Sequence, residues 1–308
     1  MVIRAHGFSL IEMIVALAIT LAATAGVFAL IVPAQGMFSA QAEASDMQQR
    51  MRVVADTLVR DLGGAGAGAH AGAAGGSLLL ELAPVLPYRS GVNADPPGTF
   101  TSDTITILSV PENGTQPVGA AYSLKSDAGG VSQLMFSDDR GNPDAPVADH
   151  IVGLAFEYYG DPQPPLMRRP LTDPTGPWTT YGPPPSAAAS APFAAGENCV
   201  FVNDGSPTPH PRLSALGAAG TALVRLTPAQ LIDGPWCPDE SAVNRWDADL
   251  LRIRRIAVTV RVEAALAALR GPAGPLFVHG GTSRGGSAWV PDREARFEVT
   301  PRNLNLGR

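Results

Sequence analysis

Two hydrophobic patterns follow one another in the first 62 residues. Residues 13–32 are almost entirely Ile, Val, Leu, Ala and Met, and no charged side chain occurs between Glu12 and Glu43. Twenty residues of α-helix rise about 30 Å, which matches the hydrocarbon core of a bilayer. This stretch is therefore predicted to be a membrane-spanning helix.

From residue 44 the apolar side chains recur every three or four positions, the spacing of one helical face. The face comprises Ala44, Met47, Met51, Val54, Leu58 and Leu62. Pro33 can kink a helix here without ending it, because neighbouring helices can satisfy the freed backbone groups. The two patterns predict one helical spine of about 80 Å. Residues 8–32 would lie in the membrane and residues 33–62 would pack on a globular head.

The rest of the chain indicates a glycine-rich linker followed by a β-rich head. Residues 63–76 are mostly Gly and Ala, so they are expected to end the helix and form a flexible connection. Residues 77–308 hold short apolar runs and alternating segments that predict antiparallel strands. The expected strands are 78–82, 104–110, 133–136, 151–159, 222–226, 250–263 and 296–300. A long helix followed by such a sheet is an α+β arrangement.

Two details refine the predicted head. Alternation changes phase within residues 250–263, which predicts a β-bulge near Arg254 and Arg255. Residues 161–192 are rich in proline, so they cannot form central strands and are expected to be surface loops.

Glu12 does not suit a simple membrane anchor. An acidic side chain within a membrane segment costs roughly 2.5–3.5 kcal/mol on insertion scales and is expected to have a partner, unless it lies at the headgroup level. The residues before it are a short basic leader, MVIRAHG, followed by Phe8. The sequence GFSLIE ahead of an apolar helix resembles the prepilin-type (type III) signal of type IV pilins and type II secretion pseudopilins.

The resemblance implies how the start of the chain is processed. A prepilin peptidase would cut on the cytoplasmic side between Gly7 and Phe8, removing residues 1–7, and the new amino group of Phe8 would be N-methylated. Glu12 of one subunit could then neutralise the Phe8 ammonium of a neighbour inside lipid, where the pair is little screened. The basic leader favours a cytoplasmic start, which would place the head in the periplasm.

Further segments resemble PilW-type minor pilins or J-type pseudopilins. They are RVVADTLVRDL, HIVGLAFEYYGD, RIRRIAVTVRVEA and FEVTPRNLNL. The resemblance implies a pilin-like, non-enzymatic subunit of the inner membrane that needs no cofactor and takes part in pilus assembly. Its partners would be the prepilin peptidase/methyltransferase, other pilins and the inner-membrane assembly platform. A type II secretion pseudopilin is the main alternative.

Less favoured functions are a DNA-uptake pilin and a membrane-anchored periplasmic enzyme. The net charge of −6 argues against a nucleic-acid partner, which would need a basic face. A G-x-S-x-G motif surrounds Ser283, but the sequence after it does not predict the helix that a hydrolase elbow requires. His150 is expected to be partly buried and hydrogen-bonded.

Cys199 and Cys237 are the two cysteines of the chain, and both lie outside the predicted membrane helix. In the oxidising periplasm they are expected to form a disulfide. Arginines 252, 254, 255 and 261 are expected to lie on a solvated or ion-paired sheet face.

An acidic turn offers a weak calcium candidate. Its oxygen ligands would come from Asp138, Asp139, Asn142 and Asp144. Calcium sites use clustered oxygens of this kind, but a plain turn built on Asp, Gly, Asn and Pro is commoner.

Overall fold

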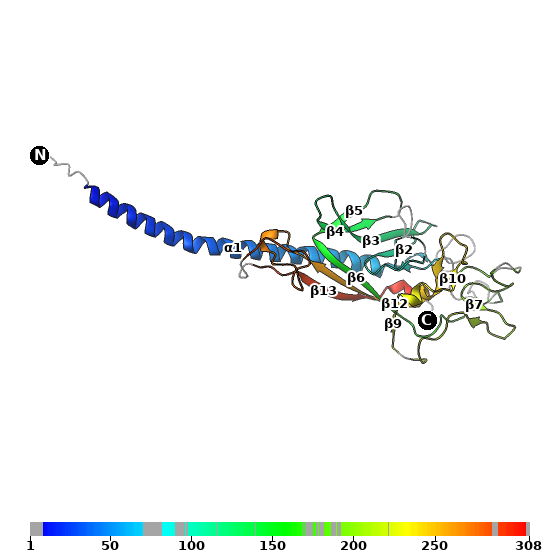
Figure 1. The fold of residues 1–308 in the computed structure, drawn as a ribbon. Coiled ribbons are helices and arrows are strands. Elements are labelled where there is room, and N and C mark those ends of the chain that lie inside the picture. Colours follow the sequence, from blue (N-terminus) through cyan, green and yellow to red (C-terminus); the bar gives the residue numbers. More distant parts are fainter. Residues whose placement is uncertain are drawn as a thin grey trace. The chain divides into compact units, whose positions relative to one another are not determined.

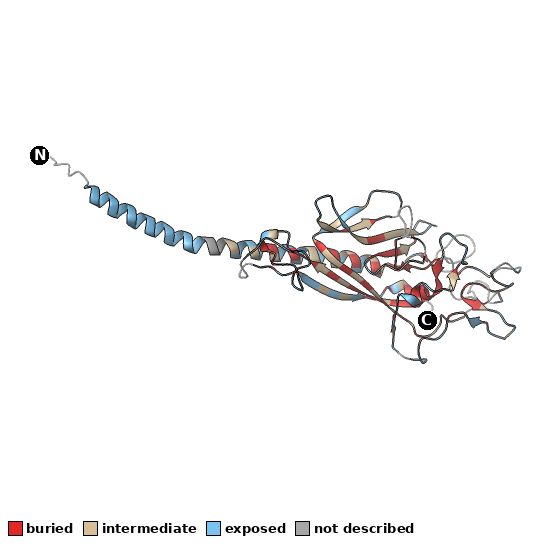
Figure 2. Ribbon diagram, in the orientation of Figure 1, coloured by how far each residue is buried: buried red, intermediate tan, exposed pale blue. Residues whose placement is uncertain are grey.

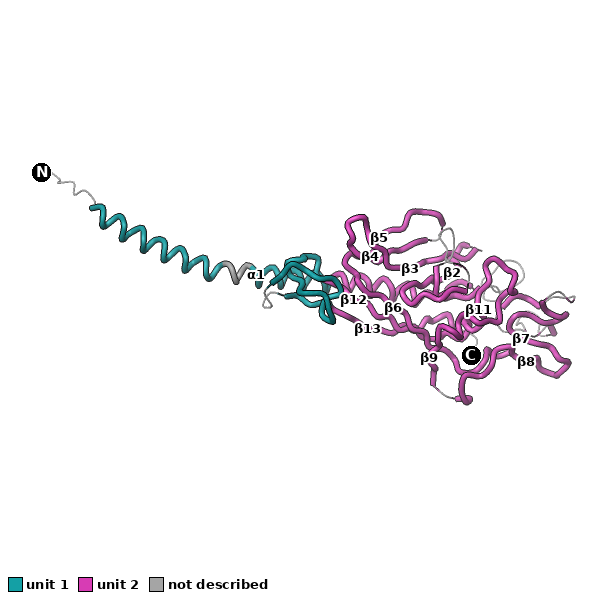
Figure 3. Tube along the Cα trace, in the orientation of Figure 1, with its two compact units in different colours: residues 1–48, 264–292 teal, residues 49–263, 293–308 magenta. Residues whose placement is uncertain are grey.

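The computed structural model describes most of the chain. The described residues are 9–69, 82–89, 96, 98–114, 116–138, 140–167, 169, 175–176, 178, 182–185, 189, 192–220, 222–284 and 289–305, without the side chains of 32–35. The chain forms two compact units (Figure 3). One contains residues 1–48 and 264–292, and the other contains residues 49–263 and 293–308.

A single helix, α1 (Leu10–Gly63), covers 54 residues and confirms the predicted spine (Figure 1). It continues through Pro33, so the proline does not end it. Within the first unit, the helix is accompanied by residues 264–292, which include the short 3₁₀ helix η5 (Ala267–Leu269).

The second unit contains the end of α1 and two main antiparallel sheets. One sheet has the order β1 (Val85–Leu86), β2 (Ile105–Ser109), β3 (Val118–Ser126), β4 (Ser132–Ser137) and β5 (Ala145–Asp149). The other has the order β13 (Arg293–Val299), β12 (Ile253–Val262), β6 (Ile151–Gly160) and β9 (Val224–Leu226). The α+β arrangement predicted from the sequence is therefore present.

Smaller elements complete this unit. Two short pairs are β7 (Phe201–Val202) with β8 (His210–Pro211), and β10 (Trp236–Cys237) with β11 (Trp246–Asp247). The 3₁₀ helices of this unit include η3 (Ala229–Leu231), η4 (Ala248–Arg252) and η7 (Arg302–Asn305).

The core of the second unit lies where α1 and the longest strands bury their apolar faces (Figure 2). Val54, Leu58 and Leu62 of α1 have no exposed surface, as their spacing of four predicted. On β12 the inward positions Val258 and Val260 are also fully buried. The helical and the strand periodicities therefore identified the same core.

Several predicted strands are confirmed and some predictions were wrong. Residues 105–109, 132–137, 151–160, 224–226 and 293–299 are strands close to the expected bounds. Residues 250–252 belong instead to η4, and the bulge appears as a register shift between Ile253 and Arg255 against β6. The strands β3 and β5 were not predicted. Residues 78–81 lie outside the described part of the chain.

The start of the glycine-rich segment, which was predicted as a flexible linker, bonds to the rest of the second unit. The helix ends at Gly63 as expected, but the next residues pack against β2 and the residue after it. The Gly66 N–H donates to the Leu108 carbonyl and the Val110 N–H donates to the Ala67 carbonyl, both at 2.8 Å. A Cβ on Gly68, whose φ is +69°, would lie 2.1 Å from the Val110 oxygen, so only glycine allows this approach. Residues 70–76 lie outside the described ranges.

Candidate functional site: the N-terminal helix

The first described turn of α1 is closed by Ser9 and Glu12. The carboxylate Oε2 of Glu12 accepts the Ser9 N–H at 2.9 Å and the Ser9 hydroxyl at 3.0 Å. The Glu12 N–H donates to Ser9 Oγ at 3.3 Å. This reciprocal arrangement is a capping box. Ser9 was not singled out from the sequence, although the S-x-x-E spacing is visible there. Gly7 and Phe8 lie outside the described residues.

The next part of α1 has an apolar and fully exposed surface. Every described side chain from residue 9 to residue 31 is exposed. Its polar side chains include Thr20 and Thr24, whose hydroxyls donate to the backbone carbonyls of Ala16 and Thr20 at 2.8 and 2.7 Å. Such bonds satisfy the hydroxyls without water. Among the described residues, α1 is the one helix long and apolar enough to cross a membrane.

The last part of α1 is held in the head by polar contacts as well as by its apolar face. The hydroxyl of Tyr122 on β3 donates to the Asp61 carboxylate, which also accepts a bond from Arg60 Nε at 2.9 Å. Burial and this bond to Asp61 raise the pKa of the Tyr122 hydroxyl, so it stays protonated and remains a donor. Arg50 Nη1 donates to the Glu263 carbonyl at 3.2 Å. The helix is therefore bonded both to β3 and to the residue that follows β12.

The predicted disulfide is present between Cys199 and Cys237, with their Cα atoms 5.3 Å apart. It joins the strand β10 to the turn before β7. Both cysteines are fully buried. The bridge therefore links two segments of the second unit that are 38 residues apart in the sequence.

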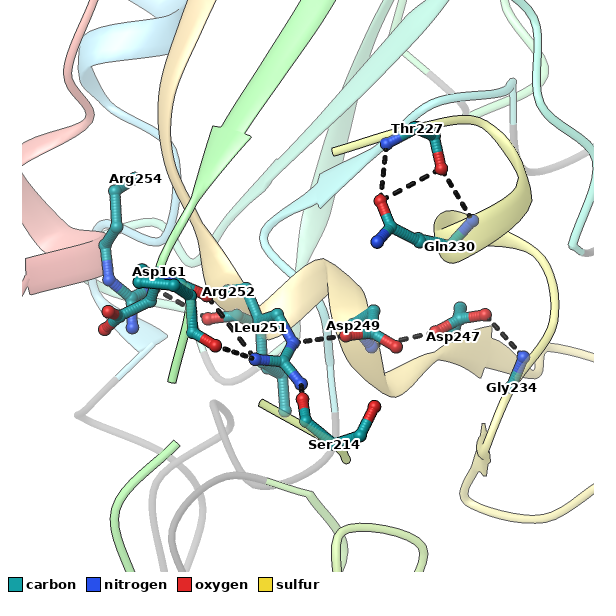
Figure 4. A network of polar contacts seen from close by, with 11 residues as sticks. Asp161, Ser214, Thr227, Gln230, Gly234, Asp247, Asp249, Leu251, Arg252 and Arg254 are labelled. Atoms are coloured by element: carbon teal, nitrogen blue, oxygen red, sulfur yellow. Dashed lines mark hydrogen bonds and ion pairs between the residues drawn. The ribbon is translucent and has the colours of Figure 1, made fainter. Parts of the chain in front are cut away.

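Asp247 and Asp249 belong to a polar network that includes the buried Arg252 (Figure 4). Carboxylate oxygens of Asp233, Asp247 and Asp249 lie within 4.8 Å of one another. Asp247 accepts the N–H groups of Gly234 at 2.7 Å and Asp249 at 2.8 Å, and Asp249 is paired with Arg252 Nε. Burial raises the pKa of Asp247 to about 7 and also raises that of Asp249. This cluster was not identified from the sequence.

The arginines that were predicted to lie on a solvated or ion-paired sheet face are divided between the interior and the surface. Arg252 is buried and its Nη2 donates to the Ser214 carbonyl at 2.5 Å. Arg254 is buried too and bonds to the Leu251 and Ile253 carbonyls. Arg255 pairs with Glu298 Oε2 at 3.0 Å. Ion pairing was predicted correctly for Arg255, whereas the burial of Arg252 and Arg254 was missed because charged residues are rarely inside.

The described residues of the acidic turn, Asp138, Asn142 and Asp144, have separate partners. Asp138 binds Asn142 Nδ2 through its own carboxylate at 2.6 Å, while Asp144 pairs with Arg89 at 2.5 Å and with Lys125. The bond from Arg89 is the main reason that the pKa of Asp144 falls to about 2. Two cations thus already neutralise Asp144, which favours the plain-turn interpretation over calcium. Asp139 lies outside the described residues.

The remaining candidates have ordinary structural contacts. Ser283 accepts a bond from Trp289 Nε1 at 3.0 Å, and the described residues around it form a loop and no elbow between strand and helix. His150 lies between β5 and β6, half-buried, with Nδ1 3.4 Å from Glu263 Oε1. This confirms the expected environment of His150.

Comparison with known proteins identifies the start of the chain. Residues 3–28 match the family model of the prokaryotic N-terminal methylation motif. Neither a curated protein nor a solved structure matches the chain. The motif is consistent with a type IV pilin-like prepilin signal, and it supports a type IV pilin or pseudopilin family. It implies processing by a peptidase and assembly with other pilins, and with the apolar helix it is consistent with a single-pass membrane anchor.

Proposed function

We propose that this chain is a minor pilin of a type IV pilus, a non-enzymatic subunit that assembles into a filament. One observation carries the proposal. The N-terminal methylation motif covers the start of a 54-residue helix. The first part of this helix exposes a mainly apolar surface, and the last part buries one face in a folded head. Other molecules must therefore cover the first part of the helix, whereas the head of the same chain covers the last part.

The exposed part of α1 has two environments that can cover it in turn. A bilayer covers it while the subunit is membrane-anchored, and the helices of other subunits cover it in a filament. Both exclude water from the same apolar surface, so transfer between them does not incur the large cost of hydrating it. Peptidase cleavage between Gly7 and Phe8 precedes this transfer, and methylation of the Phe8 amine accompanies it.

Glu12 would set the axial position of each subunit. Its Oε2 is taken by the capping bonds from Ser9, which leaves Oε1 for a donor from outside the described residues. The donor in this proposal is the Phe8 ammonium of a neighbouring subunit. Between the packed helices of a filament such a pair is little screened, so a subunit out of register would leave a costly unpaired charge.

The head is assigned to the periplasmic side of the inner membrane, with a short cytoplasmic start. Arg4 in the leader supports this orientation because positive residues favour the cytoplasmic side. The Cys199–Cys237 disulfide supports it too, since such bonds persist in oxidising compartments.

Mass spectrometry of the mature protein tests the proposal. The expected N-terminus is N-methylated Phe8; a chain that begins at Met1 or beyond residue 32 would contradict it. A deletion strain then separates the two filament systems. Loss of twitching with intact secretion supports a minor pilin, whereas loss of secretion with intact twitching would assign the chain to the type II secretion pseudopilus instead.

A further inference from the structure

Residues 264–284 and 289–292, here called the collar, form a packed element at a defined height on α1. The Ala265 N–H donates to Glu43 Oε1 at 2.6 Å, and Glu43 is only 7% exposed. The collar and residues 1–48 belong to one compact unit (Figure 3). The collar also has its own small core, in which the rings of Phe277 and Trp289 meet edge to face at 5.8 Å. It is therefore attached to the helix and is not a free loop.

The height of the collar corresponds to the surface of a bilayer. Residues 13–42 carry no charge, and thirty residues of helix rise about 45 Å. A bilayer with its headgroup regions is about 40–45 Å thick. When Glu12 lies at one surface, Glu43 and the collar bonded to it therefore reach the level of the opposite headgroups.

The outer surface of the collar is apolar where a water-facing loop would be polar. Leu266, Leu276 and Val278 are exposed, although Phe277 between the last two is buried. In the same unit, Met37 and Phe38 of α1 are exposed as well. Two exposed apolar side chains from the helix and three from the collar therefore belong to the same unit.

The charges of the collar suit an anionic surface. Arg284 is exposed, and Asp292 is the one acidic residue in the collar sequence. The Asp292 carboxylate is engaged internally, since its Oδ2 accepts the Val278 N–H at 2.8 Å. Apolar side chains combined with basic ones are typical of elements that lie in the interface of membranes containing anionic lipids.

We propose that the collar is a lipid-binding surface, which rests on phospholipid headgroups while α1 spans the bilayer. It would hold the subunit at a fixed depth before assembly and would have to leave the headgroups when the subunit is extracted. This inference rests on the membrane-anchored state of the proposed function, but it assigns a second contact that anchoring alone does not require.

Site-specific fluorescence in nanodiscs tests the proposal with the full chain. The native cysteines are joined to each other, so a single introduced cysteine can carry an environment-sensitive dye. Three variants are compared in discs of phosphatidylethanolamine and phosphatidylglycerol that hold one copy each. Leu276→Cys reports the collar, Val243→Cys reports an 81% exposed site in the other unit, and Val15→Cys reports the membrane span.

The expected result is a blue shift and strong quenching by a headgroup nitroxide at residue 276, with neither effect at residue 243. Residue 15 should be quenched by a nitroxide on the acyl chain. If residue 15 is quenched and residue 276 behaves like residue 243, the collar proposal is overturned while the anchor stands. An unquenched residue 15 overturns both. Discs loaded with two copies are compared as well. A blue shift at residue 276 that appears only in these discs would assign the collar to contacts between subunits and would overturn the lipid assignment.

Discussion

Ser9 and Glu12 bond to each other in both directions across the first turn of α1. The carboxylate accepts the Ser9 N–H and hydroxyl at 2.9 and 3.0 Å, and the Glu12 N–H donates back to the hydroxyl at 3.3 Å. One carboxylate thus has a role inside its own chain, in addition to the proposed role toward a neighbouring amine. The two roles can be separated because capping depends on Ser9 and pairing does not.

Glu12→Ala is expected to abolish incorporation into filaments while cleavage after Gly7 continues. Ser9→Ala removes the capping hydroxyl and costs about 1 kcal/mol of helix stability, but it keeps the charge and should assemble. Glu12→Gln keeps a capping oxygen without the charge and should fail as Glu12→Ala does. The measurements are the mass of the mature N-terminus and the amount of subunit in sheared filaments.

Two outcomes would contradict this account of Glu12. Normal recovery of Glu12→Ala in sheared filaments would remove the pairing role. Failure of Ser9→Ala together with normal assembly of Glu12→Gln would point to helix capping as the property that assembly requires.

Adjacent positions on α1 allow a matched test of how the helix is held in the head. Leu58 is 0% exposed and Val59 is 45% exposed. Leu58→Ala is expected to destabilise the head by about 2–5 kcal/mol through lost burial and a cavity. Val59→Ala should change the stability by less than about 0.5 kcal/mol. Urea unfolding of the detergent-solubilised protein measures both, and equal effects would mean that the helix is not buried on this face.

The sequence predicted those elements whose own side chains determine their structure. The four-residue spacing of Val54, Leu58 and Leu62 and the alternation along β12 are local patterns that burial enforces. The strand β3 was missed because VGAAYSLKS lacks a β-branched run. It is a strand because β2 and β4 pair with it on both sides, a condition that only the folded chain supplies.

The candidate site was predictable to a similar extent. Glu12 was found because an acid in an apolar run is conspicuous, whereas its partner Ser9 was overlooked. The bond between Glu43 and Ala265 joins residues 222 positions apart, so no local pattern could reveal it. Arg252 was placed on the surface because a buried guanidinium is exceptional. Its ion-pair partner Asp249 could not be predicted because the 3₁₀ turn of η4, which brings the two side chains together, was not predicted.

The Cys199–Cys237 disulfide is expected to stabilise the head substantially. The two cysteines are 38 residues apart, and closing a loop of that length contributes roughly 4 kcal/mol in the chain-entropy description. Replacing both by serine should lower the unfolding midpoint by roughly 10 °C for a unit of this size. Thermal unfolding followed by circular dichroism measures it. Dithiothreitol should lower the midpoint of the native protein and leave that of the double variant unchanged.

The buried carboxyl group of Asp247 makes the stability of the head depend on pH. Its pKa is raised to about 7, chiefly by burial, whereas an Asp in the unfolded chain titrates near 3.9. Between these values the folded state binds more protons than the unfolded state, so its stability must fall as the pH rises. The full stabilisation is present below about pH 4, and the decline ends above about pH 7. A shift of this size corresponds to a loss of about 4 kcal/mol at most.

Asp247→Asn should remove this part of the pH dependence. The amide oxygen can still accept the N–H of Gly234 or Asp249, but it cannot lose a proton. The variant is therefore expected to lose less stability than the native protein between pH 4 and pH 7. Glu240→Gln, at an exposed position nearby in the sequence, is the matched control and should keep the native slope. Urea unfolding at a series of pH values measures the slopes. If Asp247→Asn kept the native decline, another group would have to be responsible, and the neighbouring Asp249, whose pKa is also raised by burial, would be the next to replace.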